Sequence, residues 1–185
     1  MKLKIGSAIA ILFLIFIDAT AVAQAYSVGT LSGMVGAEAL FAETKLSQTN
    51  RTGVGANVKG EYIFSTHAST TLSTGYYFLP GKTRQDFKSP DIAAIPLKAG
   101  ARYYLGSFYG AGEIGALFFV DENNRTGVSY SMGLGDKLNL GSNVFDISLR
   151  HEGWSVNNIS RGFIGLRVAY EFALSKQQST ILPAL

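Results

Sequence analysis

The chain has 185 residues, 47% of them hydrophobic, with 16 Lys and Arg against 13 Asp and Glu and no Cys. A formal net charge of +3 does not indicate a nucleic-acid partner. The lack of Cys excludes disulfides, thiol chemistry and a lipid-anchor cysteine. The 21 Gly and 4 Pro accompany many short alternating runs, a composition typical of an all-β protein, because glycine lets strands bend and approach closely.

Residues 1–25 are expected to be a signal peptide. Lys2 and Lys4 precede an apolar run from Ile5 to Ile17, and a small-residue cleavage site follows between Ala21 and Ala25. The run is shorter than the roughly 20 residues that a membrane-spanning helix needs. We therefore expect export, with one domain in the remainder of the chain.

Eight segments then alternate apolar and other residues with the two-residue period of β-strands. They cover 30–41, 53–64, 69–79, 92–105, 108–120, 127–140, 144–151 and 162–172, and the connections between them alternate between long and short. Outer-membrane barrels have an even number of strands, short periplasmic turns and longer external loops. The pattern predicts an eight-stranded antiparallel up-and-down transmembrane β-barrel over 26–173, followed by a mobile periplasmic tail at 174–185.

The last predicted strand shows which face meets the membrane. Ile164, Leu166 and Val168 share one face, and Arg167 and Glu171 occupy the other. An apolar outside and an ionic inside suit a barrel in lipid. Aromatic residues are expected at the two membrane interfaces, with Tyr62, Phe64, Tyr103, Phe108, Tyr170 and Phe172 on the periplasmic side and Phe41, Tyr76, Phe78 and Phe118 on the outer side.

Charged residues recur at the inward positions. The predicted interior network consists of Glu38, Lys59, Glu61, Lys98, Arg102, Glu113, Asp146, Arg150, Arg167 and Glu171. With Glu152 added, five cations face six anions. Eight strands enclose only enough space for side chains, and buried charges need partners. We therefore expect a filled, ion-paired lumen and no open pore.

Three stretches resemble the small outer-membrane β-barrel domain proteins of Bacteroidetes-type bacteria, a porin-family, OmpA-like group. These are 95–104, 145–152 and 165–172. The resemblance implies an outer-membrane location and a barrel fold more than an activity. The final strand, which ends in Tyr170 and Phe172, also resembles the signal that the barrel-assembly machinery reads, although the tail from Ala173 places it inside the chain.

Two motifs in the sequence bear on catalytic or cofactor chemistry. Gly110 to Gly115 matches the dinucleotide fingerprint, which requires a helix to follow, but the aromatic and branched run after it indicates a strand. Outer-membrane deacylases of lipid A use a His, a Ser two positions later and a carboxylate. Here Gly153 occupies that position after His151, Ser155 stands four positions along, and Glu152 points the other way.

The sequence therefore predicts an outer-membrane barrel with a structural or surface-binding role, no enzymatic activity, no cofactor and no metal. Its expected partners are outer-membrane lipid, lipopolysaccharide and, during insertion, the barrel-assembly machinery; we expect a monomer that binds no nucleic acid. Two alternatives stay open. One is a lipid A-modifying hydrolase using His151 and Ser155, and the other is a soluble periplasmic barrel that binds an apolar ligand inside, with the two faces inverted.

Overall fold

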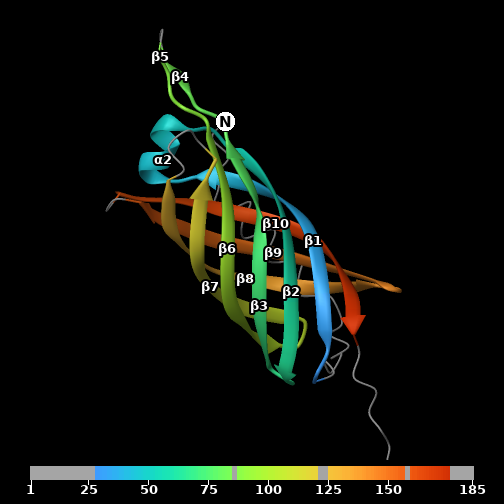
Figure 1. Cartoon of the computed structure of the whole chain (residues 1–185). Helices are drawn as coiled ribbons and strands as arrows, with labels where there is room; N and C mark the ends of the chain where they lie inside the picture. Colours follow the sequence, from blue (N-terminus) through green and yellow to red (C-terminus); the bar gives the residue numbers. More distant parts are fainter. Residues whose placement is uncertain (1–27, 85–86, 121–124, 157–158, 176–185) are drawn as a thin grey trace, which may run out of the picture.

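The computed structural model describes residues 28–84, 87–120, 125–156 and 159–175. Eight antiparallel strands form a closed barrel in which β1 pairs with β10 (Figure 1). The barrel strands are β1 (Leu31–Ala42), β2 (Gly53–Ser65), β3 (Ala68–Leu79), β6 (Ile92–Leu105), β7 (Phe108–Phe119), β8 (Thr126–Leu140), β9 (Asn143–Val156) and β10 (Ile159–Ser175). The predicted fold class is confirmed. The predicted signal peptide and residues 176–185 of the tail lie outside the described residues.

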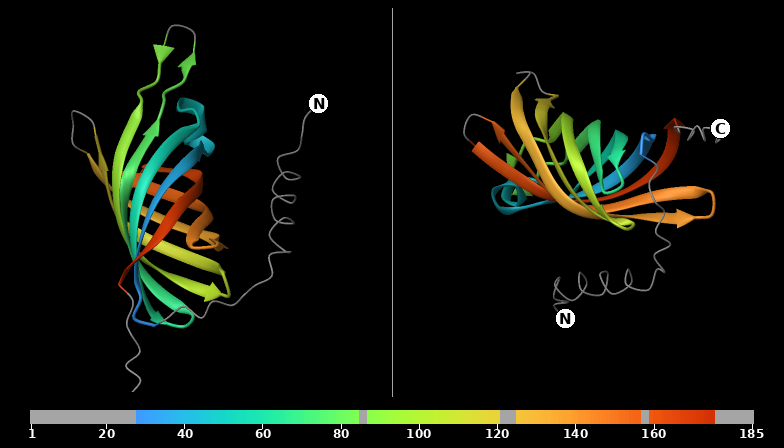
Figure 2. Two further views of the ribbon diagram at one scale, coloured as in Figure 1. Left: turned by 90° about the vertical axis from the view of Figure 1, so that its right-hand side faces the viewer. Right: turned by 90° about the horizontal axis from the view of Figure 1, so that it is seen from below.

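The two ends of the barrel differ (Figure 2). At one, which we call the turn end, two-residue turns begin with Gly106 and Gly141, whose φ angles of 71° and 66° suit glycine. Val28 and Ser175, the described ends of the chain, also lie there. At the opposite loop end stand the helix α2 (Thr44–Thr49) and a hairpin of β4 (Thr83–Arg84) and β5 (Phe87–Lys88). Both elements fall in segments that the sequence predicted to be plain polar loops.

The last loop is much shorter than predicted. β9 and β10 pair as far as Val156 with Ile159, so the expected polar loop at 152–161 is wrong. Glu152 and Trp154 simply continue the inward alternation of β9, because the lumen supplies partners for a charged side chain there. β10 also runs to Ser175, two residues beyond the predicted end of the barrel. The glycine motif at 110–115 lies within β7, as predicted.

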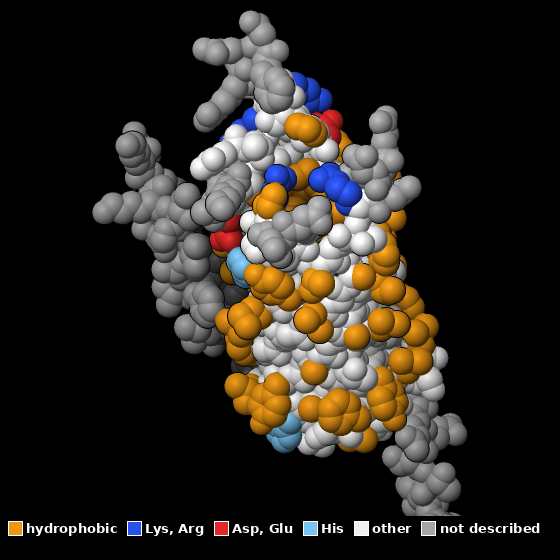
Figure 3. Space-filling view, turned by 60° about the vertical axis from the view of Figure 1, so that its left-hand side comes forward, with side chains coloured by type: hydrophobic (Ala, Val, Ile, Leu, Met, Phe, Trp, Pro, Cys, Tyr) orange, Lys and Arg blue, Asp and Glu red, His pale blue; other side chains and the backbone are white. Residues whose placement is uncertain are grey.

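The outward face of the barrel is apolar. Val54, Ile114 and Met132 expose 64%, 63% and 68% of their surface, and hydrophobic side chains cover the wall below the loop end in Figure 3. Among the Lys, Arg, Asp, Glu and His residues of the eight described barrel strands, only Asp136 and His151 stand at outward positions. No helix in the described part of the chain has both the length and the apolar character needed to cross a membrane.

Candidate functional site

The inward positions gather all ten predicted network residues in the lumen. Seven of them are buried: Glu38, Glu61, Lys98, Arg102, Glu113, Asp146 and Arg167. Lys59, Arg150 and Glu171 are half-buried. The prediction omitted Lys137, which is 2% exposed. Its position continues the inward set of β8, opposite to Tyr130 and Met132, so the same alternation could have found it. With Lys137 and Glu152, the described lumen holds six cations and six anions.

These side chains form two chains of alternating charge. The first, the Glu61 chain, runs Glu171–Lys137–Glu61–Arg102–Asp146–Arg167, with successive N–O distances of 2.8, 2.9, 3.2, 2.8 and 2.7 Å. The second, the Glu152 chain, runs Lys59–Glu113–Lys98–Glu152–Arg150–Glu38, with distances of 2.6, 3.7, 2.6, 2.9 and 2.6 Å. Each chain carries three positive and three negative charges and is neutral by itself.

Asn57 on β2 connects the two chains. Its side-chain nitrogen donates to Glu38 Oε1 at 2.8 Å, and its side-chain oxygen accepts from Arg167 Nε at 2.7 Å. The amide thus satisfies an anion of one chain and a cation of the other with its two different groups. Twelve charged residues and one amide form a single bonded network.

Hydroxyl groups complete the partners of the buried carboxylates. Glu152 accepts from Ser129 at 2.9 Å and from Tyr77 at 3.1 Å, and Glu61 accepts from Tyr104 and Ser69. Tyr109 donates to Asp146, and its ring lies under the Arg102 guanidinium at 4.2 Å. These hydrogen bonds offset part of the cost of removing the charges from water, and the buried Arg102 Nε is left without a hydrogen-bond partner. The arrangement is a packed polar core.

An apolar plug closes the lumen at the loop end. It consists of the buried residues Leu40, Leu46, Tyr77, Leu79, Ala94, Leu117, Trp154 and Phe163. Leu46 comes from α2, so the helix contributes directly to the closure. Two cavities among the charged side chains below measure about 20 and 10 Å³, room for roughly one water molecule each. The described side chains around these two cavities leave little free volume.

Polar contacts fix α2 and the hairpin over the plug. Asn50 donates to the carbonyl oxygens of Leu79 at 3.1 Å and Pro90 at 3.2 Å, and the Lys82 ammonium donates to the Ser47 carbonyl. Asp91 accepts from the Gly81 amide at 2.7 Å, and this bond, with the nearby Lys88 ammonium, lowers the pKa of its carboxyl. These hydrogen bonds hold α2 and the hairpin together as a cap over the plug.

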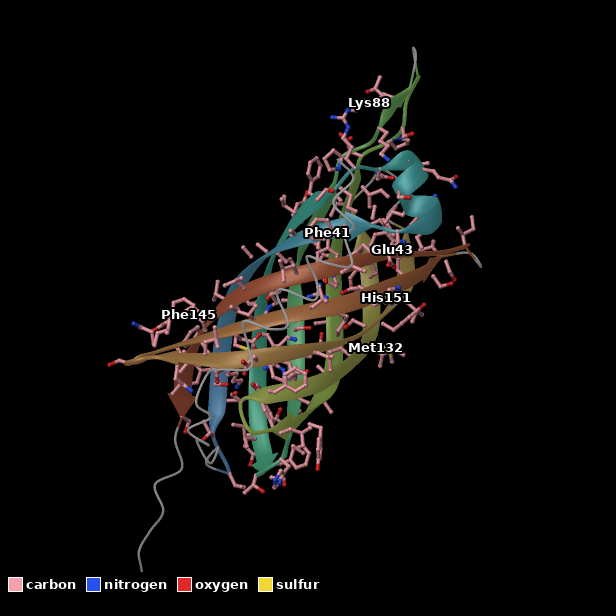
Figure 4. The ribbon with its side chains drawn as sticks, turned by 180° about the vertical axis from the view of Figure 1, so that it is seen from behind. Phe41, Glu43, Lys88, Met132, Phe145 and His151 are labelled. Carbon is pink, nitrogen blue, oxygen red and sulfur yellow. The ribbon has the colours of Figure 1, made fainter. Side chains whose placement is uncertain are left out.

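The structure does not assemble the hydrolase site. His151 points outward at the loop end and pairs through Nε2 with Glu43 Oε2 at 3.1 Å (Figure 4). Glu43, which the sequence did not indicate, supplies a carboxylate partner for the histidine. Ser155 is four residues away in the same strand, roughly 13 Å at the usual rise of a strand. Glu152, the carboxylate next to His151, is fully buried inside. The triad lacks its nucleophile–base contact.

The inverted barrel is also ruled out. A soluble barrel that binds an apolar ligand requires Ile164, Leu166 and Val168 to line the lumen. In the structure Val168 is exposed outside, while its neighbours Arg167 and Ala169 are buried inside. The lumen contains the ion network, so that alternative is wrong.

Comparison with known proteins identifies the fold. No protein-family model and no curated protein matches the chain. The crystal structure of Ail, the attachment invasion locus protein of Yersinia pestis, matches with a TM-score of 0.56 and 19% identity, over 78% of this chain and 99% of that one. Ail with the heparin analogue sucrose octasulfate and Ail in a phospholipid bilayer nanodisc give 0.54 and 0.53 at the same identity and coverage. Identity this low shows a shared barrel fold and no more, and the Bacteroidetes-type resemblance stays a prediction.

Proposed function

We propose that this chain is an outer-membrane β-barrel protein with a structural or surface-binding role and without catalysis. One observation carries the proposal. At the outward positions of the described barrel strands, Asp136 is the one residue among Lys, Arg, Asp and Glu, and His151 is the one His, whereas the lumen holds twelve charged residues. A lipid environment accounts for this distribution, because in water the apolar outward face would stay exposed to solvent, which is unfavourable.

The shape of the barrel supports an orientation. Outer-membrane barrels place short turns and both chain ends in the periplasm and longer loops outside. The turn end of this barrel has that character, so α2 and the β4–β5 hairpin face the outside. Ail has the same barrel fold, and its structure in a phospholipid bilayer nanodisc is that of an outer membrane protein.

The contents of the lumen support the proposal that the barrel has no open pore. A pore needs a continuous aqueous path, but the plug and the two neutral chains leave cavities for single waters. The loop end is then the part that meets other molecules, and lipopolysaccharide around the barrel is the partner that we propose there. The barrel-assembly machinery would read β10 during insertion, and we expect the inserted protein to be a monomer.

Cell fractionation followed by gel mobility with and without boiling tests this proposal. We expect recovery in the outer membrane and a heat-dependent shift of the detergent-solubilised protein. Reconstitution into planar bilayers should give no sustained current. Recovery in the soluble periplasm would overturn the location, and stable current steps would overturn the closed lumen.

A further inference from the structure

Exposed cations of the described chain gather at the loop end. Among the Lys and Arg side chains that the structure describes, the exposed ones are Arg51, Lys88, Arg125 and Arg161, and we call them the basic surface. Asp91 is the exposed carboxylate among the described residues, and it pairs with Lys88 at 3.3 Å. The short turns at 66–67, 106–107 and 141–142 contain no Lys, Arg, Asp or Glu. Figure 3 shows the same asymmetry, with Lys and Arg above the apolar wall.

The basic surface extends away from the membrane plane. Figure 4 places Lys88 on the hairpin, beyond α2 and well beyond His151 and Glu43. Headgroups of a lipid leaflet lie in one layer, whereas Lys88 stands on the hairpin beyond α2. The arrangement fits a long polyanion that approaches from the water better than it fits the phosphates of the surrounding lipid.

Two arginines stand beside an aromatic pair at the mouth of the barrel. Arg125 lies over the Phe119 ring at 5.3 Å, and Phe119 packs edge-on against Trp154 at 5.9 Å. Arg161 is the ladder partner of Trp154 and shares the inward face of β10 with Phe163. Phe119 is half-buried, so an apolar ring surface accompanies the two guanidinium groups. Guanidinium forks bind sulfate and carboxylate through paired hydrogen bonds.

We propose that the basic surface binds an anionic polysaccharide from the outer aqueous side. Arg125 and Arg161 bind acidic groups on neighbouring sugars beside Phe119, and Arg51 and Lys88 bind the chain as it continues over the cap. Charges spaced along a flexible polymer match cations spread over the loop end. The inference rests on the proposed function, because it needs the loop end to face outward.

The test uses the full-length protein in phosphatidylcholine nanodiscs, with fluorescent dextran sulfate as the probe and uncharged dextran as the control. Arg51, Lys88, Arg125 and Arg161 are replaced together by Gln. We expect affinity for dextran sulfate to fall at least about tenfold and to weaken with added salt, because exposed ionic contacts are screened. The matched variant Arg51→Lys, Arg125→Lys and Arg161→Lys keeps all four charges but loses the guanidinium forks, so its affinity should lie between those of the Gln variant and the parent.

The pair Arg51→Gln and Lys88→Gln leaves the aromatic mouth untouched and should show an intermediate loss. The heat-dependent gel shift reports whether each variant is folded. Equal affinity of the Gln variant and the parent for dextran sulfate would overturn the inference. The inference would also be overturned if the parent protein bound lipopolysaccharide in the nanodisc but did not bind dextran sulfate. A protein in the outer membrane that binds no dextran sulfate refutes this inference alone, whereas a soluble protein refutes the proposed function.

Discussion

Arg167 donates its Nε hydrogen to Asn57 Oδ1 across 2.7 Å, and this bond joins the Glu61 chain to the Glu152 chain. Asn57 completes the connection by donating to Glu38. Each chain is neutral without the other, so the amide is not needed for charge balance. It serves instead to satisfy groups that the two chains leave at their ends, and it fixes how they pack against each other.

Replacing Asn57 by Leu should therefore destabilise the barrel by about 2 kcal/mol, because a buried guanidinium N–H and a carboxylate oxygen lose their partners. The measurement is the urea midpoint of the protein folded in lipid vesicles. Val58→Leu, one residue along and facing outward, is the control and should change little. Equal midpoints for the two variants would contradict the bridging role.

The position of a charged residue within the Glu61 chain or the Glu152 chain should determine how much stability the barrel loses when that residue is replaced. Arg102 bonds both Glu61 and Asp146, so Arg102→Met should cost about 3–5 kcal/mol, the usual effect of breaking a buried ion pair. Lys59 ends its chain, and its partner Glu113 keeps Lys98. Lys59→Met should cost only about 1–2 kcal/mol. Unfolding in lipid vesicles compares them, and a larger loss for Lys59→Met would refute the chain description.

Removing the centre of the plug should destabilise the barrel without opening it. Trp154 is 1% exposed and packs against Phe119 and Phe163, so Trp154→Ala should cost about 3–5 kcal/mol. The ion network below still fills the lumen, and planar-bilayer recordings should stay silent. Current steps from this variant would mean that the plug alone keeps the barrel closed.

His151→Ala and Ser155→Ala should each leave the acyl composition of lipid A unchanged. The reason is geometric, since His151 bonds Glu43 and Ser155 lies four residues along the strand. Mass spectrometry of lipid A from cells expressing the parent and each variant provides the comparison. A change in acyl chains that both variants abolish would restore the hydrolase hypothesis.

A charged residue introduced on the outward face should destabilise the barrel most when it lies in the middle of a strand. Ile114 lies in the middle of β7 and is 63% exposed, and Leu105 lies beside a turn and is 66% exposed. Ile114→Arg should destabilise the barrel by about 2–4 kcal/mol and Leu105→Arg by at most about 1 kcal/mol, because the penalty depends on depth in the bilayer. Denaturant unfolding in vesicles measures both. Equal small effects would indicate that the wall faces water.

The sequence by itself determined the eight barrel strands and which face of each is apolar. Alternation with a period of two is a local property, and it survives in a barrel because lipid and lumen select opposite residue types. Ile164, Leu166 and Arg167 already showed that division. The same alternation also predicts Lys137 at an inward position. The polar residues of 152–161 indicate a loop, but in the structure β9 and β10 stay paired as far as Val156 and Ile159 because the lumen supplies partners for Glu152.

Only the tertiary structure decided which charges pair. Glu61 meets Lys137 across 76 positions of sequence, and Arg167 meets Asn57 across 110. Such contacts depend on barrel closure and on the register of every strand, which the alternation within a single strand does not encode. The cap follows the same logic, since Glu43 reaches His151 and Leu46 enters the plug only because β1 and β10 close the barrel.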